Sequence, residues 1–125
     1  MELEFYNACE QGKLDDIKNL INQNIDLCNW QNSKDDMRTP LMVACASNQI
    51  DIVKFLLKQP FIDINQQKVD DVTSLIIVCC CEYNAIVELL IKDNRVVVTA
   101  IDIYHQTSLW LSCYWENLKT INVQN

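Results

Sequence analysis

Glycine is almost absent from this sequence, since Gly12 is the only one among its 125 residues. Loops that cradle phosphates or dinucleotides need several closely spaced glycines, so the composition argues against sites of those kinds. Histidine is just as scarce, with His105 alone, and no two cysteines stand in a Cys-x-x-Cys pair. The sequence therefore lacks the usual ligand spacing of a zinc centre. We expect no metal, no cofactor, no small-molecule substrate and no catalysis.

Long apolar runs and a basic N-terminus are missing as well. The longest run, Leu75 to Cys81, is much shorter than the roughly 20 residues that span a bilayer. The opening residues, Met1 to Glu4, are acidic, unlike the start of a secretory signal. We therefore expect a soluble protein of the cytoplasm or nucleus without membrane insertion. The seven cysteines, an odd number, should be thiols in such a reducing compartment.

The charge balance is acidic, with a formal net charge of -7. A negative surface repels the phosphate backbone, so nucleic acid is not an expected partner. A basic protein surface suits this charge better. Half of the residues are apolar, which is enough for a folded core.

A repeat accounts for most of what is present. Thr39, Thr73 and Thr107 stand 34 residues apart, and each opens a similar segment: TPLMVAC, TSLIIVC and TSLWLSC. A further copy opens the chain at an offset of 36, with Phe5 and Cys9 matching Leu41 and Cys45. The two extra residues fit an insertion in the connector near residues 31–33.

Each copy predicts two short helices. Thr39 can cap the first helix, with Pro40 at the first helical position, where a missing N–H costs nothing. The apolar residues from Ile50 to Leu57 recur at helical spacing. No copy can bury its apolar face alone, so neighbouring copies should stack into a solenoid.

These motifs resemble the ankyrin repeat, a helix pair of about 33 residues opened by Thr-Pro-Leu-His. The segment 39–44 follows that pattern, except that Met42 replaces the histidine. The resemblance implies an all-α solenoid of helix-turn-helix units with hairpin-like turns between repeats. It implies one domain, 1–125, with repeats at 1–33, 34–67, 68–101 and an incomplete 102–125.

Three family positions depart from the pattern. The histidine is replaced by Met42, Ile76 and Trp110, so its hydrogen bond with the threonine is lost. The hairpin glycine is replaced by Met37, Asp71 and His105, and the glycine between the helices by Asn48, Glu82 and Glu116. If those positions keep a positive φ, each non-glycine residue carries strain.

The cysteines favour a structural role over a metal or redox role. Cys9, Cys45, Cys79 and Cys113 share one repeat position inside the first helix, where a thiol acts as a small buried apolar group. Cys80 and Cys81 should be exposed on the inner face. His105 falls in a hairpin turn without a catalytic partner.

The resemblance implies that first helices and hairpin tips form a concave surface that binds a protein or peptide. Paired aspartates at the tips are either an acidic stripe for a basic partner or solvated turn residues. Tyr114 and Trp115 are either interface anchors or packing for a further repeat. The candidate contact residues are Asp35, Asp36, Arg38, Ala46, Ser47, Asp70, Val72, Cys80, Cys81, Tyr104, Gln106, Tyr114 and Trp115.

The sequence thus predicts a non-enzymatic protein-interaction module. Two alternatives stay open. The chain is a fragment or targeting module of a larger protein whose activity lies elsewhere, or it is an inhibitor of a partner enzyme such as a protein kinase.

Overall fold

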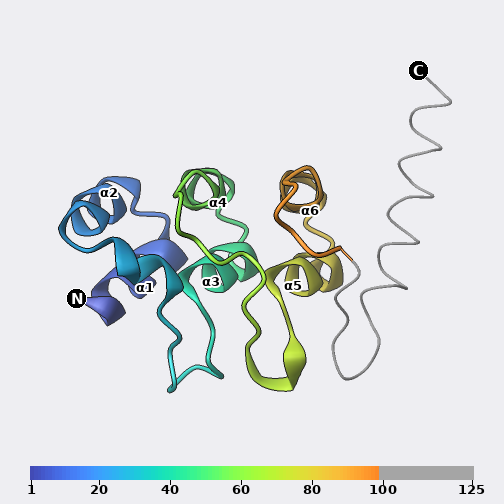
Figure 1. Cartoon of the computed structure of the whole chain (residues 1–125), viewed down its shortest axis with the longest axis horizontal. Coiled ribbons are helices and arrows are strands. Elements are labelled where there is room, and N and C mark those ends of the chain that lie inside the picture. Colours follow the sequence, from blue (N-terminus) through green and yellow to red (C-terminus); the bar gives the residue numbers. More distant parts are fainter. Residues whose placement is uncertain (99–125) are drawn as a thin grey trace, which may run out of the picture.

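The computed structural model describes residues 1–98, which form three stacked helix pairs (Figure 1). In chain order the elements are α1 (Glu2–Gln11), α2 (Leu14–Gln23), η1 (Ile25–Asn29), α3 (Pro40–Ala46), α4 (Ile50–Leu57), η2 (Val69–Asp71), α5 (Ser74–Cys81) and α6 (Asn84–Ile91). Helices α1, α3 and α5 make one layer and are called the inner helices, and α2, α4 and α6 make the other and are called the outer helices (Figure 1). The predicted all-α architecture of paired helices is confirmed.

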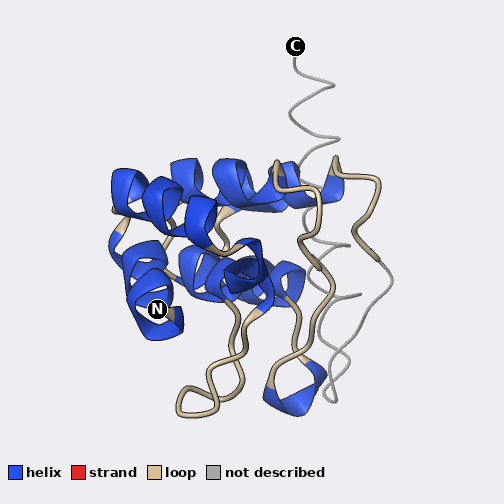
Figure 2. Cartoon of the chain, turned by 60° about the vertical axis from the view of Figure 1, so that its left-hand side comes forward, coloured by secondary structure: helices blue, strands red, loops and turns tan. Residues whose placement is uncertain are grey.

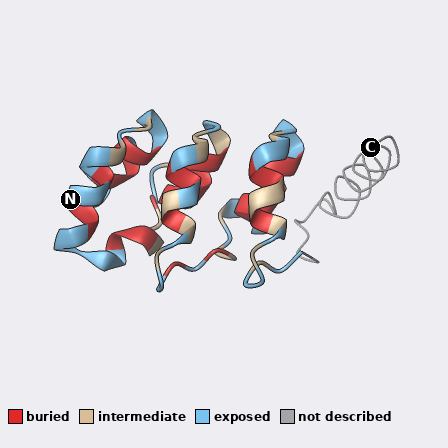
Figure 3. Ribbon diagram, turned by 90° about the horizontal axis from the view of Figure 1, so that it is seen from above, coloured by how far each residue is buried: buried red, intermediate tan, exposed pale blue. Residues whose placement is uncertain are grey.

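A continuous core runs through the stack between the two layers, as the buried sides of all three pairs show (Figure 3). The outer helices contribute Ile17, Val53 and Val87 at one repeat position, each at most 1% exposed. The inner helices contribute Cys9, Cys45 and Cys79 at another repeat position. Their small side chains allow neighbouring helix pairs to approach closely. Because each pair is covered by its neighbour, the core belongs to the stack and not to any single copy.

Threonine caps start α3 and α5 as predicted. The Thr39 hydroxyl accepts from the Met42 N–H at 3.2 Å, and the Thr73 hydroxyl accepts from the Ile76 N–H at 3.4 Å. Met42 also receives the Thr39 N–H on its sulfur at 3.5 Å. A weak thioether acceptor thus stands where the ankyrin pattern has histidine.

The two connectors fold into hairpins of unequal length. The Asn32 N–H donates to the Arg38 carbonyl at 2.8 Å, and the Lys68 N–H donates to the Val72 carbonyl at 2.9 Å. These bonds enclose residues 33–37 in the first hairpin and residues 69–71 in the second. The two extra residues therefore lie in the first hairpin tip. This tip begins at residue 33, the last residue of the segment 31–33 near which we expected the insertion.

The positions that lost glycine keep its backbone conformation. Met37 and Asp71 have φ of 64° and 63° in the hairpins, while Asn48 and Glu82 have φ of 53° and 60° between the helices. The remaining glycine, Gly12, has φ of 74° at the equivalent turn. The predicted strain is therefore present, since this conformation costs a non-glycine residue roughly 1–2 kcal/mol.

The cysteines divide as the repeat register predicts. Cys9, Cys45 and Cys79 are at most 5% exposed, whereas Cys80 and Cys81 are exposed at the end of α5. Burial raises the pKa of the thiols of Cys9 and Cys45, and raises that of Cys79 to about 11. Within residues 1–98 no cluster of side chains is suited to hold a metal ion. Cys113 lies outside the described residues.

Replacing Glu82 by glycine should stabilise the protein, because glycine adopts the left-handed cap of α5 without a steric penalty. We expect Glu82→Gly to raise the free energy of unfolding by about 0.5–1 kcal/mol, measured by urea denaturation followed by circular dichroism. Lys58→Gly is the control, since Lys58 ends α4 at a φ of -80°. An equal gain in the control would contradict this explanation.

Thiol alkylation should separate the two kinds of cysteine, because an exposed thiol reacts and a buried, protonated thiol does not. Brief treatment of the native protein with iodoacetamide should modify Cys80 and Cys81 and spare Cys9, Cys28, Cys45 and Cys79. Peptide mass spectrometry reads out each site, and treatment in denaturant provides the fully modified reference. Rapid native labelling of Cys45 would contradict the packing described above.

Candidate functional site

The predicted contact residues fall into two groups in the structure. One group, Asp35, Asp36, Arg38, Asp70 and Val72, lies on the hairpins that project beyond the inner helices (Figure 1). The other group, Ala46, Ser47, Cys80 and Cys81, lies at the opposite ends of α3 and α5. The remaining candidates, Tyr104, Gln106, Tyr114 and Trp115, lie outside the described residues.

Hydrogen bonds join the two hairpins into one surface, which we call the hairpin ridge (residues 31–38 and 67–72). The Val69 N–H donates to the Asp36 carbonyl at 3.0 Å. The Gln31 side-chain amide donates to the Met37 carbonyl at 3.2 Å and to the Gln67 carbonyl at 3.0 Å. Figure 2 shows the two loops projecting side by side below the helices. These bonds hold the backbones of the two hairpins next to each other.

The charge of the hairpin ridge is mixed, with the acidic side chains more exposed. Asp36, Asp70 and Asp71 are exposed, and no ion pair among residues 1–98 involves them. Arg38 and Lys68 are half-buried at the hairpin bases, and Lys34 is exposed. Carboxylates therefore predominate among the exposed charged side chains of the hairpin ridge.

The inner helices between the two groups are almost closed to a partner. Every residue of α3 from Pro40 to Cys45 is buried, and so is every residue of α5 from Ser74 to Cys79. Exposed side chains appear only at the last turns, at Ser47, Cys80 and Cys81. The two groups are separated by the length of an inner helix, about 10 Å at 1.5 Å per residue. A partner that contacts both groups must span this length.

One carboxylate of the ridge is already engaged within the protein. Asp35 is half-buried and accepts a hydrogen bond from the hydroxyl of Tyr6 in α1. Sequence reasoning missed Tyr6 because the two residues lie 29 positions apart and belong to different repeats. The only sequence signal was its repeat position, which is that of the missing family histidine.

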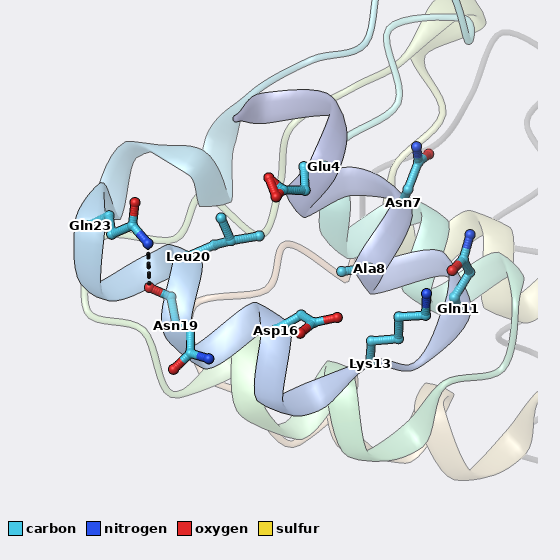
Figure 4. Close-up of a pocket in the computed structure, with 9 residues that line it drawn as sticks. All are labelled: Glu4, Asn7, Ala8, Gln11, Lys13, Asp16, Asn19, Leu20 and Gln23. Carbon is cyan, nitrogen blue, oxygen red and sulfur yellow. Dashed lines mark hydrogen bonds between the residues drawn. The ribbon is translucent and has the colours of Figure 1, made fainter.

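A hollow of about 530 Å³ lies on the outer side of the first helix pair, between α1 and α2 (Figure 4). Ala8 and Leu20 form its floor, and its rim is polar. Asn7, Asp16 and Asn19 line it where the second copy has the apolar residues Val43, Ile52 and Phe55. Its carboxylates and amides suit water better than an apolar ligand. Sequence reasoning did not identify this hollow.

None of the helices within residues 1–98 is long and apolar enough to cross a membrane.

Comparison with known proteins identifies the family. A family model described as ankyrin repeats, in three copies, matches residues 5–68, which is 64 of the 125 residues. No curated protein matches the sequence.

Among solved structures, 130 chains match. One belongs to the complex of Bd0816, a predatory endopeptidase from Bdellovibrio bacteriovorus, with the immunity protein Bd3460. The match has 32% sequence identity and a TM-score of 0.66, and covers 76% of this chain and 48% of that one. This chain thus aligns with about half the length of the solved chain. The repeated helix pairs, the capping threonines and the family match lead to one conclusion: the chain belongs to the ankyrin-repeat family.

Proposed function

We propose that this protein is a non-enzymatic module that binds a protein or peptide partner through the hairpin ridge and the exposed ends of α3 and α5. The observation that carries the proposal is the hydrogen-bonded ridge with its exposed aspartates. Ankyrin repeats serve as protein-interaction modules, and this ridge is the most exposed polar part of the predicted concave surface.

Two hairpins held together in advance favour binding, because a backbone that is already ordered loses less entropy on association. The bonds between Val69 and Asp36 and between Gln31 and Gln67 hold the two tips together before a partner arrives. Asp36, Asp70 and Asp71 supply negative charge, and within residues 1–98 none of them forms an ion pair. We infer a basic partner surface, whose encounter with the ridge is accelerated by charge.

Inhibition of a partner enzyme is a second candidate function. It is supported by the structural neighbour from the complex of an endopeptidase with its immunity protein, at 32% identity. That likeness adds peptidases to the protein kinases considered from the sequence. The proposed ridge suits such a role, because a rigid projecting surface can cover an active-site entrance.

Removal of the ridge carboxylates should weaken partner capture. We expect the variant Asp36→Ala, Asp70→Ala, Asp71→Ala to bind its partner at least about tenfold more weakly than wild type, and more so at low salt. Affinity capture from lysate of the source cell, quantified by mass spectrometry, identifies the partner. Calorimetry with the purified partner then gives Kd.

The matched control is Asp15→Ala, Asp16→Ala, Asp51→Ala, which removes the same charge from exposed positions on α2 and α4. Circular dichroism checks that both variants fold. Equal loss in both variants would assign the effect to net charge and reject the ridge. If the captured partner is an enzyme, its activity with one equivalent of the wild-type domain tests the inhibitor candidate.

A further inference from the structure

Tyr6 takes a role that no other repeat of the described chain provides. It lies in α1 at the position of Met42 in α3 and Ile76 in α5. Its side chain is 2% exposed, and its hydroxyl donates to the carboxylate of Asp35 in the first hairpin tip. Methionine and isoleucine have no hydroxyl, so this link between an inner helix and a tip is specific to the first copy.

The surroundings of Tyr6 fix its hydroxyl in place. Its ring packs edge-on against Trp30, with ring centroids 5.9 Å apart and planes at 83°. Burial raises the pKa of the Tyr6 phenol, and the hydrogen bond to Asp35 raises it further, whereas the nearby charge of Arg38 lowers it. A phenol is protonated at neutral pH in any case, and the raised pKa extends this state to more alkaline pH, so the hydroxyl remains a donor.

The first tip needs support, because it is two residues longer than the second. Asn32 organises its base: the carbonyl accepts from the N–H groups of Asp35 at 3.0 Å and Met37 at 2.9 Å, and the side chain accepts from the Lys34 N–H at 3.0 Å. Asp36 and Met37 nevertheless both have positive φ, at 56° and 64°. Tyr6 adds the contact that holds this strained tip against the helix layer.

The effect of this contact extends to the second hairpin. Asp36 follows Asp35 directly and accepts the Val69 N–H through its carbonyl. A change in the conformation of the first tip therefore moves the Asp36 carbonyl, which is the hydrogen-bond acceptor for the Val69 N–H. Tyr6 is thus connected to the second tip by its hydrogen bond to Asp35, the peptide bond from Asp35 to Asp36 and the hydrogen bond between Asp36 and Val69.

We propose that Tyr6 is a positioning residue for the hairpin ridge, which holds Asp35 and thereby orients Asp36 and the neighbouring tip for a partner. This inference rests on the proposed function for its biological meaning. Its structural part stands on the hydrogen bonds alone. Tyr6 itself is buried and does not touch the partner.

The test replaces the hydroxyl alone. Tyr6→Phe keeps the ring packed on Trp30, so the helices should fold as in wild type. We expect amide hydrogen exchange at Met37 and Val69 to accelerate about fivefold or more, the effect of losing one hydrogen bond, with exchange in α3 and α4 unchanged. Tyr83→Phe is the control, because Tyr83 is half-buried in the α5–α6 turn and outside the ridge.

Variants of Asp35 distinguish positioning from general destabilisation. Asp35→Asn keeps an acceptor for the phenol and should retain slow exchange, whereas Asp35→Ala should match Tyr6→Phe. The double variant Tyr6→Phe, Asp35→Ala should exchange no faster than either single variant, because both remove the same bond. Additive effects, or unchanged exchange in Tyr6→Phe, would overturn the proposal.

Partner capture provides the second measurement. Loosened tips should weaken capture by Tyr6→Phe, although every ridge carboxylate is still present. Faster exchange with undiminished capture would overturn the role of Tyr6 in binding. If wild type captures no partner, the proposed function fails, and the exchange data still decide whether Tyr6 positions the tips.

Discussion

The stack depends on the apolar core that each helix pair shares with its neighbour. An asparagine side chain in the loop after α2, and another in the loop after α4, also bind the loop that follows one copy later. Asn29 donates to the Phe61 carbonyl and accepts from the Asp63 N–H, both at 2.8 Å. Asn65 repeats the arrangement one copy later, with the Arg95 carbonyl and the Val97 N–H, again at 2.8 Å. One amide group thus satisfies a backbone donor and a backbone acceptor of its neighbour. This contact fixes the separation of adjacent loops and, with it, the register in which the hairpins meet.

Stacking and recognition place opposite demands on the inner helices. Close approach of the pairs requires small or apolar side chains there, which accounts for Ala44, Cys45 and Cys79 and for their burial. Helices α3 and α5 consequently expose no polar groups to a partner between their two ends. Recognition is left to segments that do not pack between repeats, namely the hairpin tips and the last turns of α3 and α5.

Features that recur in each copy could be predicted from the sequence. The helix pairs, the capping by Thr39 and Thr73 and the buried cysteines follow from the repeat alignment. The positive φ of Met37 and Glu82 was expected only on the condition that these residues keep the conformation of the family's glycines. The contacts that make the site could not be predicted. The Tyr6–Asp35 bond and the Val69–Asp36 bond join residues far apart in sequence, at positions where the copies differ. Their partners depend on how the hairpins lie in space, which no local pattern encodes.

The unequal hairpins have a consequence for how such a surface changes over evolution. Both hairpins close with the same pair of backbone groups at their base, although one tip holds two more residues than the other. Lengthening a loop beyond such a base costs little chain entropy and leaves the helices undisturbed. Insertions, deletions and substitutions at the tips can therefore accumulate with little loss of foldability. Specificity for one partner can be exchanged for another while the scaffold beneath is inherited unchanged.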